Sequence, residues 1–213
     1  MFLDRTDAGA QLGKTLLKYK GPDTIVLAIP RGGVEIGYEV AKTLAAPLSL
    51  IIARKLPIPN NPEAGFGAVA EDGSIWLVPG FRSYLTPDTV EEIIAEQTAE
   101  IRRRIDALRG GRELPEIKGK TVILVDDGIA MGSTMRASVQ YCRNHEAGKV
   151  IVAAPVTGSD TAWDMEMIAD DVVILELPPN FGAVAQVYEN WYDVPDEEVL
   201  EIMKKISNSN SRK

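Results

Sequence analysis

Short apolar runs rich in β-branched residues alternate along the chain with longer stretches of helical periodicity. Apolar runs of this length predict strands that are buried on both faces of a sheet. The predicted strands are Thr24–Ile29, Leu48–Ala53, Thr121–Val125, Val150–Ala154 and Val172–Leu175. The predicted helices are Asp7–Tyr19, Val34–Leu44, Pro87–Leu108, Ser133–Asn144, Asp160–Ala169 and Asp196–Ile206. This alternation predicts an α/β fold with a parallel sheet and right-handed crossovers.

Two segments interrupt the alternation. Leu56–Val78 is rich in Pro, Gly and Asn, and it predicts a long loop leading into a hairpin with strands at Gly67–Ala70 and Ser74–Val78. Pro178–Val194 is irregular and carries four aromatic residues. We expect the first segment to be a flexible part and the second to form a small cover. The polar residues Ser207–Lys213 predict a disordered tail.

Length and composition favour one globular domain over residues 1–213, with a core of about residues 20–177. Residues 178–195 and the N-terminal segment would form a small hood on it. The net charge of −8 argues against a nucleic-acid partner. No apolar run approaches the roughly 20 residues that cross a membrane, and the N-terminus lacks a secretion signal, so we expect a cytoplasmic protein without a membrane partner. The single cysteine, Cys142, is interpreted as a core residue.

The segment Val122–Thr134 carries the strongest chemical signal. A predicted buried strand ends in Asp126 and Asp127, at the sheet edge where open α/β sheets bind ligands. The turn that follows has a glycine, and two hydroxyl residues begin a helix. Free backbone amides and the helix dipole at such a place favour a phosphate group. The two carboxylates suit ribose hydroxyls or a magnesium ion. The alternative is a plain strand end followed by a helix N-cap.

Two further motifs follow the first and second predicted strands. Arg31-Gly32-Gly33 begins a helix, and its glycines would allow backbone amides to approach an anion closely. Arg54-Lys55 leaves the same predicted sheet edge. On their own these motifs are weak, because a glycine turn and a surface pair of cations are both common. Their shared position at one edge predicts a single anion-binding site.

The three motifs together resemble the type I phosphoribosyltransferase family. The resemblance covers about residues 7–175, and the matching segments are Met1–Gly9, Ile29–Val34, Ala53–Lys55 and Val125–Gly132. It implies a Rossmann-like parallel-sheet core with a small hood and a flexible loop or hairpin. It also implies phosphoribosyl pyrophosphate as the donor, Mg²⁺ as the cofactor and a small acceptor base as the second substrate. A homodimer is left open.

The resemblance assigns a role to each motif. Asp126 and Asp127 would bind the ribose hydroxyls and the metal. The turn would bind the 5′-phosphate through Ala130, Met131, Gly132, Ser133 and Thr134. The pyrophosphate would meet Arg31, Gly32 and Gly33, together with the catalytic cations Arg54 and Lys55. Met131 departs from the family, which usually has Thr or Ser there, so one phosphate hydroxyl is missing.

The implied activity is transfer of the phosphoribosyl group to a nitrogenous base or related small nucleophile, with release of pyrophosphate. The alternative is a binding protein that senses phosphoribosyl pyrophosphate without turnover. Residues Pro57–Gly67, with Glu63, would form a lid over the reacting centre. Ala130 argues against recognition of a 6-oxopurine by an acid at that place. Glu71 loosely matches an adenine-binding glutamate, but the interpretation as an acid in a hairpin turn is favoured. Three aromatic residues could stack on a base or form the core of the hood, namely Phe181, Tyr188 and Trp191.

Overall fold

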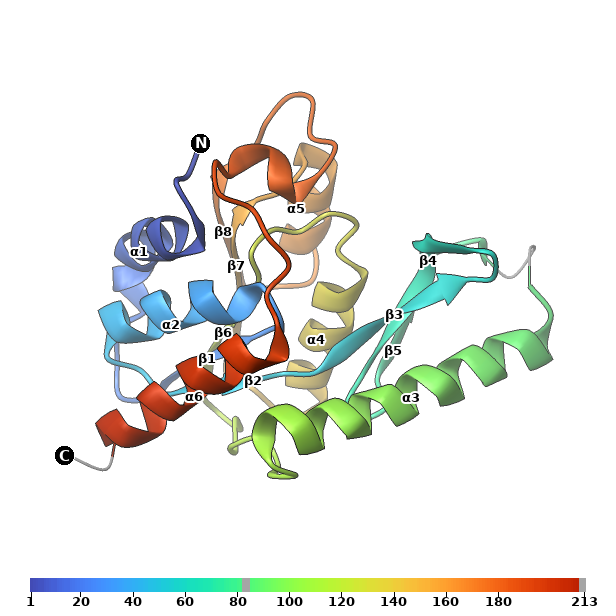
Figure 1. Cartoon of the computed structure of the whole chain (residues 1–213), viewed down its shortest axis with the longest axis horizontal. Helices are drawn as coiled ribbons and strands as arrows, with labels where there is room; N and C mark the ends of the chain where they lie inside the picture. Colours follow the sequence, from blue (N-terminus) through green and yellow to red (C-terminus); the bar gives the residue numbers. More distant parts are fainter. Residues whose placement is uncertain (82–84, 211–213) are drawn as a thin grey trace.

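A five-stranded parallel sheet forms the centre of the protein, which we describe from a computed structural model (Figure 1). The structure describes residues 1–81 and 85–210, without the side chains of residues 62, 63 and 207–210. The strand order is β2-β1-β6-β7-β8, and every neighbouring pair is parallel. The strands are β1 (Thr24–Ala28), β2 (Leu48–Leu50), β6 (Thr121–Val125), β7 (Lys149–Val156) and β8 (Asp171–Glu176). The predicted α/β class is confirmed.

Helices cover both faces of this sheet. The helices of the structure are α1 (Arg5–Thr15), α2 (Gly33–Leu44), α3 (Pro87–Arg109), α4 (Ser133–Asn144), α5 (Ser159–Glu166) and α6 (Asp196–Asn210), of which α3 packs on the second sheet described below. Two 3₁₀ turns are η1 (Leu16–Tyr19) and η3 (Val184–Val187). The predicted helix over residues 7–19 therefore ends as a 3₁₀ turn, and α5 is shorter than predicted.

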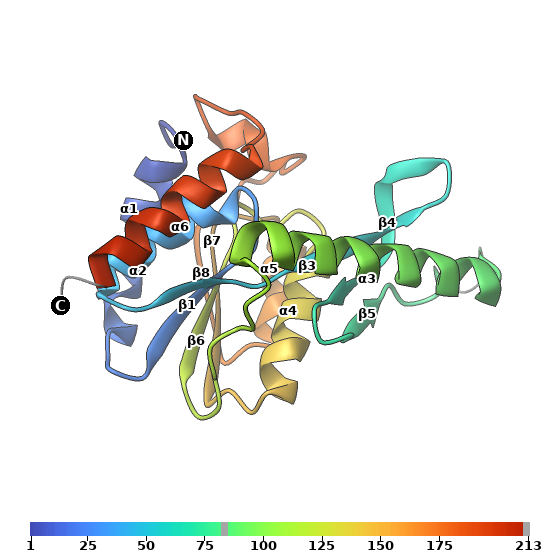
Figure 2. The ribbon, with the colours of Figure 1, turned by 60° about the horizontal axis from the view of Figure 1, so that its bottom comes forward.

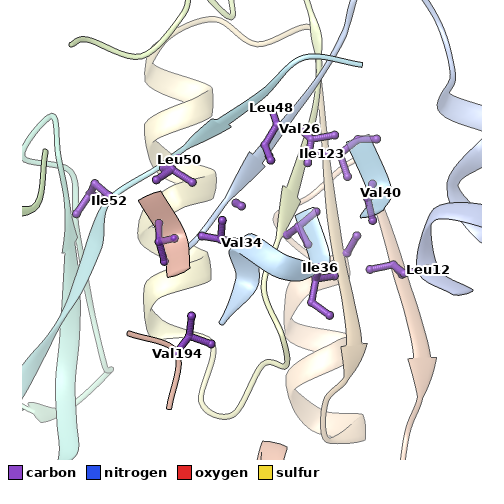
Figure 3. Packing of buried hydrophobic residues seen from close by; sticks show 14 of the residues in the cluster. Leu12, Val26, Val34, Ile36, Val40, Leu48, Leu50, Ile52, Ile123 and Val194 are labelled. Atoms are coloured by element: carbon purple, nitrogen blue, oxygen red, sulfur yellow. The ribbon is translucent and has the colours of Figure 1, made fainter. Parts of the chain in front are cut away.

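Alternate residues of the buried strands pack into two separate cores, because successive side chains point to opposite faces of a sheet. Val26 and Ile123 face one core, which they share with Val40 of α2 and Leu12 of α1 (Figure 3). Ile25, Leu27 and Ile29 face the other core, which α4 and α5 complete. Cys142 belongs to that second core and is fully buried, as predicted. Continuous apolar strands are thus explained by burial on both sides.

A second, antiparallel sheet replaces the predicted long loop. It consists of β3 (Ala53–Ile58), β4 (Asn61–Ala70) and β5 (Ile75–Leu77) in the order β3-β4-β5. The strand predicted from Leu48 is present but its predicted end at Ala53 was wrong, since β2 ends at Leu50 and the chain enters the second sheet at Ala53. The sheet projects from the main body alongside α3 in both views (Figures 1 and 2). Most of residues 56–78 therefore form regular strands.

The N-terminal segment pairs with the irregular segment that precedes α6. The Phe2 amide donates to the Val187 carbonyl at 2.7 Å, and the Glu189 amide donates to the Phe2 carbonyl at 2.9 Å. Helix α6 continues to Asn210, so the helix includes residues 207–210 of the predicted disordered tail. Residues 211–213 lie outside the described part of the chain. No helix in the described residues is long and apolar enough to cross a membrane.

Candidate functional site

Asp126 and Asp127 lie at the carboxyl end of β6, followed by a turn that leads into α4. The Asp127 amide donates to Asp126 Oδ1 at 2.9 Å, which fixes the first carboxylate. The turn is anchored where the Ile129 amide donates to the Val156 carbonyl at 2.9 Å. Gly132 immediately precedes α4 with a φ of 74°, a conformation that favours glycine. The first backbone N–H groups of α4 are thereby directed at the turn, as an anion site requires.

A cavity of about 310 Å³ lies beside this turn. Its lining combines one cation, one acid, the turn and the start of α4, namely Lys55, Asp126, Gly128, Ile129, Ala130, Met131, Gly132, Ser133, Thr134 and Met135. All five residues predicted to hold the 5′-phosphate therefore lie in one cavity. The Met131 side chain is 56% exposed, so its replacement of a hydroxyl residue does not disturb the core.

The Arg31-Gly32-Gly33 loop packs directly against the two acids. A Cβ on Gly32 would lie 1.8 Å from Asp127 Oδ2, and a Cβ on Gly33 would lie 2.9 Å from the Asp126 Cα. Neither position has room for a side chain. The peptide bond between Pro30 and Arg31 is cis. Two motifs that are far apart in the sequence thus meet through glycine and aspartate.

Arg5 contacts Asp127, and no sequence motif predicted this pair. Arg5 Nε lies 2.8 Å from Asp127 Oδ2, and the Arg5 side chain is 3% exposed. Arg5 also donates to the Tyr192 carbonyl, and its Cζ lies 4.0 Å from the centre of the Trp191 ring. A contact between residues so far apart in the sequence leaves no local pattern. The only indication of a role for Arg5 was its place in the matching segment Met1–Gly9.

Burial dominates the electrostatics of the acid pair, and the Asp127 charge adds to it at Asp126. Burial and the neighbouring Asp127 charge raise the pKa of Asp126 well above its ordinary value. Burial also raises the pKa of Asp127, while the Arg5 guanidinium opposes that rise. Two adjacent carboxylates are difficult to ionise at the same time. A cation or hydrogen-bond donors placed between them stabilise the ionised pair.

Arg54 and Lys55 lie on β3 of the second sheet and not at the end of a strand of the parallel sheet. The split of the predicted strand after Leu50 is the reason for this correction. Arg54 Nε donates to Gln97 Oε1 of α3 at 3.1 Å. Burial and nearby arginines, Arg104 first among them, lower the pKa of Arg54. Lys55 lines the cavity beside the turn of residues 130–134, whereas Arg54 is directed toward α3.

Glu71 does not join this site. It forms a buried ion pair in which Arg109 Nη2 lies 2.6 Å from Glu71 Oε2, and both side chains are 6% exposed. The pair lines a separate cavity of about 620 Å³ near Tyr141 and Asn144, toward the opposite end of α4. Its match to an adenine-binding glutamate is therefore wrong, and the structure supports the alternative of an acid beside a turn.

Two aromatic residues of the 178–194 segment, Tyr188 and Trp191, contact residues at the site. Tyr188 is buried, and its hydroxyl donates to the Asp127 carbonyl at 2.7 Å. Phe181 packs on Gly158, while Trp191 covers Arg5. These contacts favour a place for Tyr188 in the core of the hood over stacking on a base. The side chain of Glu63, the predicted lid residue, lies outside the described part of the structure.

The acid pair fits the chemistry of a magnesium site. Its carboxylate oxygens are the hard ligands that Mg²⁺ prefers, and Mg²⁺ typically takes one or two carboxylates plus substrate phosphates and waters. The described residues include no group of three or more His, Cys, Asp or Glu that could hold a metal alone. The donor set therefore suits a metal that arrives with a phosphorylated ligand.

The sequence of residues 6–190 matches the phosphoribosyl transferase domain, so the chain belongs to the phosphoribosyltransferase family. It is 39% identical over 209 residues to "Putative phosphoribosyl transferase Rv0571c" of Mycobacterium tuberculosis, a match that covers 96% of this chain and 47% of that protein. It is 25% identical over 202 residues to the amidophosphoribosyltransferase of Escherichia coli, covering 90% of this chain and 34% of that protein. The chain spans half or less of the length of these relatives.

Solved structures agree with this membership. The fold matches TT1426 from Thermus thermophilus with a TM-score of 0.82 and 35% identity, covering 96% of this chain and 98% of that one. It also matches the purine phosphoribosyltransferase of Pyrococcus horikoshii with a TM-score of 0.52 and 16% identity, covering 92% and 95% of the two chains. The type I phosphoribosyltransferase fold that the resemblance implied is confirmed.

Proposed function

We propose that this chain is a phosphoribosyltransferase that binds phosphoribosyl pyrophosphate with Mg²⁺ and transfers the phosphoribosyl group to a nitrogenous base or a related small nucleophile. The observation that carries the proposal is the meeting of Gly32 with Asp127 beside the phosphate turn. It brings together the three parts that the donor needs, which are an anion loop, an acid pair and a phosphate cradle.

Each part has a distinct task in the proposal. The 5′-phosphate binds the turn of residues 130–134, where backbone amides and the start of α4 favour negative charge. Asp126 and Asp127 accept hydrogen bonds from the ribose hydroxyls. The pyrophosphate binds the backbone of Gly32 and Gly33, with Arg31 beside it. The long anionic ligand then spans the sheet edge from β1 to β6.

Catalysis in this site depends on positioning and charge. The nitrogen nucleophile attacks C1 of the ribose, the bond from C1 to the pyrophosphate oxygen breaks, and its electron pair leaves with the pyrophosphate. Arg31 and Lys55 stabilise the departing negative charge, and Arg54 on β3 adds its positive charge to theirs. The cover formed by residues 178–194 excludes water from the centre. No covalent enzyme intermediate is required.

Asp126 and Asp127 would hold Mg²⁺ together with oxygens of the donor. The bound ion supplies neutralisation of the pyrophosphate charge. Because burial and the Asp127 charge raise the proton affinity of Asp126, a divalent ion that neutralises this charge would be bound favourably by the pair.

The decisive experiment combines donor binding with turnover. The protein is incubated with phosphoribosyl pyrophosphate, Mg²⁺ and a panel of purines, pyrimidines and small amines, while pyrophosphate release is measured. Calorimetry in parallel measures donor affinity for the protein and for Asp127→Asn. We expect release with at least one acceptor and a loss of affinity of about tenfold or more in the variant. An unchanged affinity would mean that the ribose site is misplaced.

The same experiment separates the enzyme from a sensor that binds the donor without turnover. Tight donor binding with no release across the whole panel would support the sensor. Absence of donor binding would contradict both.

A further inference from the structure

Arg5 is held on several sides by charged, polar and aromatic groups. Its Nε lies 2.8 Å from Asp127 Oδ2 and its Nη1 lies 3.9 Å from Glu35 Oε1, so one guanidinium faces two acids. Nη1 also donates to the Tyr192 carbonyl at 3.0 Å. The Trp191 ring covers the guanidinium with its face, at 4.0 Å from Cζ. Such a group has little freedom to move.

The position of Arg5 links three segments that are distant in the sequence. It belongs to the first turn of α1, Asp127 follows β6, and Trp191 and Tyr192 follow η3. The Arg31-Gly32-Gly33 loop reaches the same point, because a Cβ on Gly32 would lie 3.0 Å from Arg5 Nε and 1.8 Å from Asp127 Oδ2. Arg5 therefore determines where the Asp127 carboxylate lies relative to the glycine loop.

A buried charged pair of this kind is poorly explained by stability alone. Desolvation of an ion pair generally offsets most of its attraction, and apolar residues of similar size often stabilise a fold equally well. What a planar guanidinium supplies is fixed geometry, since its N–H groups point in set directions. That property is useful where a carboxylate must be held in one orientation for a ligand.

We infer that Arg5 is a positioning residue of the donor site. It fixes the Asp127 carboxylate beside Gly32 and attaches the segment Tyr188–Tyr192 to this carboxylate. The inference rests on the proposed function, because it assigns Arg5 a role in binding phosphoribosyl pyrophosphate. Arg5 acts through Asp127 and is too buried to be a main contact of the ligand. Donor binding and the order of the segment Tyr188–Tyr192 are thereby coupled.

A double-mutant cycle tests this inference. Donor affinity is measured by calorimetry, with Mg²⁺ present, for the full chain, Arg5→Met, Asp127→Asn and the double variant. We expect Arg5→Met to weaken binding about tenfold, as is usual when a residue that orients a ligand-binding group is lost. The double variant should bind as Asp127→Asn does, within about threefold, because Arg5 has nothing left to position. Arg5→Lys should recover only part of the loss, since it keeps the charge without the planar fork.

Trp191→Leu provides a second arm should Arg5→Met fail to fold. Removal of the ring releases one side of the guanidinium, and we expect a loss of donor affinity of about threefold. Trp163→Leu is the matched control, because Trp163 is exposed on α5, and its affinity should not change. Losses that multiply in the double variant would overturn the positioning role, as would an unchanged affinity in Trp191→Leu. If the unaltered chain does not bind the donor but folds normally, the proposed function itself fails.

Discussion

Gly32 shows how a single missing side chain organises the candidate site. Its φ of −59° suits any residue, so the backbone conformation does not require glycine. Space does require it, because the Asp127 carboxylate occupies the place where a Cβ would be. The glycine is therefore a contact residue between the Arg31-Gly32-Gly33 loop and the acid pair.

Gly32→Ala should weaken both folding and donor binding. The added methyl group must displace Asp127 or the loop, and overpacking of this kind typically costs about 1–3 kcal/mol of unfolding free energy. We also expect donor affinity to fall by about tenfold or more, since a displaced Asp127 no longer orients the ribose. Chemical denaturation and calorimetry measure the two effects. Gly21→Ala is the control, since the nearest atom to its new Cβ would be 3.8 Å away, and it should change neither.

Met131→Thr should keep or improve donor binding. The residue lies in the phosphate turn with 56% of its surface exposed. The exchange should therefore alter the unfolding free energy by no more than about 0.5 kcal/mol. A hydroxyl at this place adds one hydrogen-bond donor for the 5′-phosphate. Calorimetry with phosphoribosyl pyrophosphate measures the change, and a large loss of affinity would show that the methionine has a role of its own.

Residues in local motifs could be predicted from the sequence, and residues in long-range contacts could not. Asp126, Asp127 and the phosphate turn follow one another along the chain, and the structure brings them together with Gly32 and Gly33. Arg5 is separated from Asp127 by 122 positions. Nothing near Arg5 in the sequence indicates that it pairs with an acid, because that pairing exists only after α1 packs on α2 and brings Arg5 to the residues that follow β6.

At the scale of elements, the strands of the parallel sheet were predicted with one error, in the segment from β2 to β3. Leu48–Leu50 and the next two isoleucines form one run, and all are buried. The chain leaves the first sheet within that run, where neither Gly nor Pro marks the change. Only the tertiary structure determines which strands pair with the residues after Leu50, so Arg54 and Lys55 were assigned to the wrong sheet.

Helix α3 supplies a pH-dependent contribution to stability through Glu100. Arg103 and Arg104 donate to its carboxylate, and the bonds from Arg103 Nε and Arg104 Nε measure 2.7 and 2.9 Å. These arginines lower the pKa of Glu100 to about 2 from an ordinary 4.5. A lowered pKa in the folded state means that the stabilisation is complete above about pH 4.5 and is lost as the pH falls toward 2.

Glu100→Gln should therefore reduce the unfolding free energy at pH 7 by about 0.5–1 kcal/mol, the range for partly exposed ion pairs. The difference from the unaltered chain should shrink between pH 4.5 and pH 2. Urea denaturation at a series of pH values measures it. Glu92→Gln on the exposed side of the same helix serves as the control. A difference that stays constant down to about pH 2 would contradict the assignment.

At the scale of the whole molecule, the N-terminal segment and the segment before α6 converge on the proposed donor site. The N-terminal residues pair with residues 187–190, and the same two segments contribute Arg5 and Trp191 to the environment of Asp127. Both segments were predicted to form one small hood, although they lie near opposite ends of the sequence. The arrangement makes the site sensitive to packing that lies outside every motif.

Phe2 is the side chain that joins these two segments most directly. It is 2% exposed, and its ring centre lies 5.7 Å from that of Tyr188, whose hydroxyl in turn donates to the Asp127 carbonyl. Phe2→Ala removes a buried aromatic ring, which typically costs about 3–5 kcal/mol. We expect the loss of this contact to loosen residues 187–192 and to weaken donor binding as well as folding.

Leu3→Ala is the natural comparison, because Leu3 is the next residue along the chain and is 52% exposed. Thermal denaturation and donor calorimetry on both variants separate the possibilities. A loss of stability in Phe2→Ala with unchanged donor affinity would mean that the paired segments support the fold but not the site. Loss of both, with Leu3→Ala unaffected, would show that the cover over Asp127 transmits packing at the N-terminal segment to the acid that we propose binds the ribose.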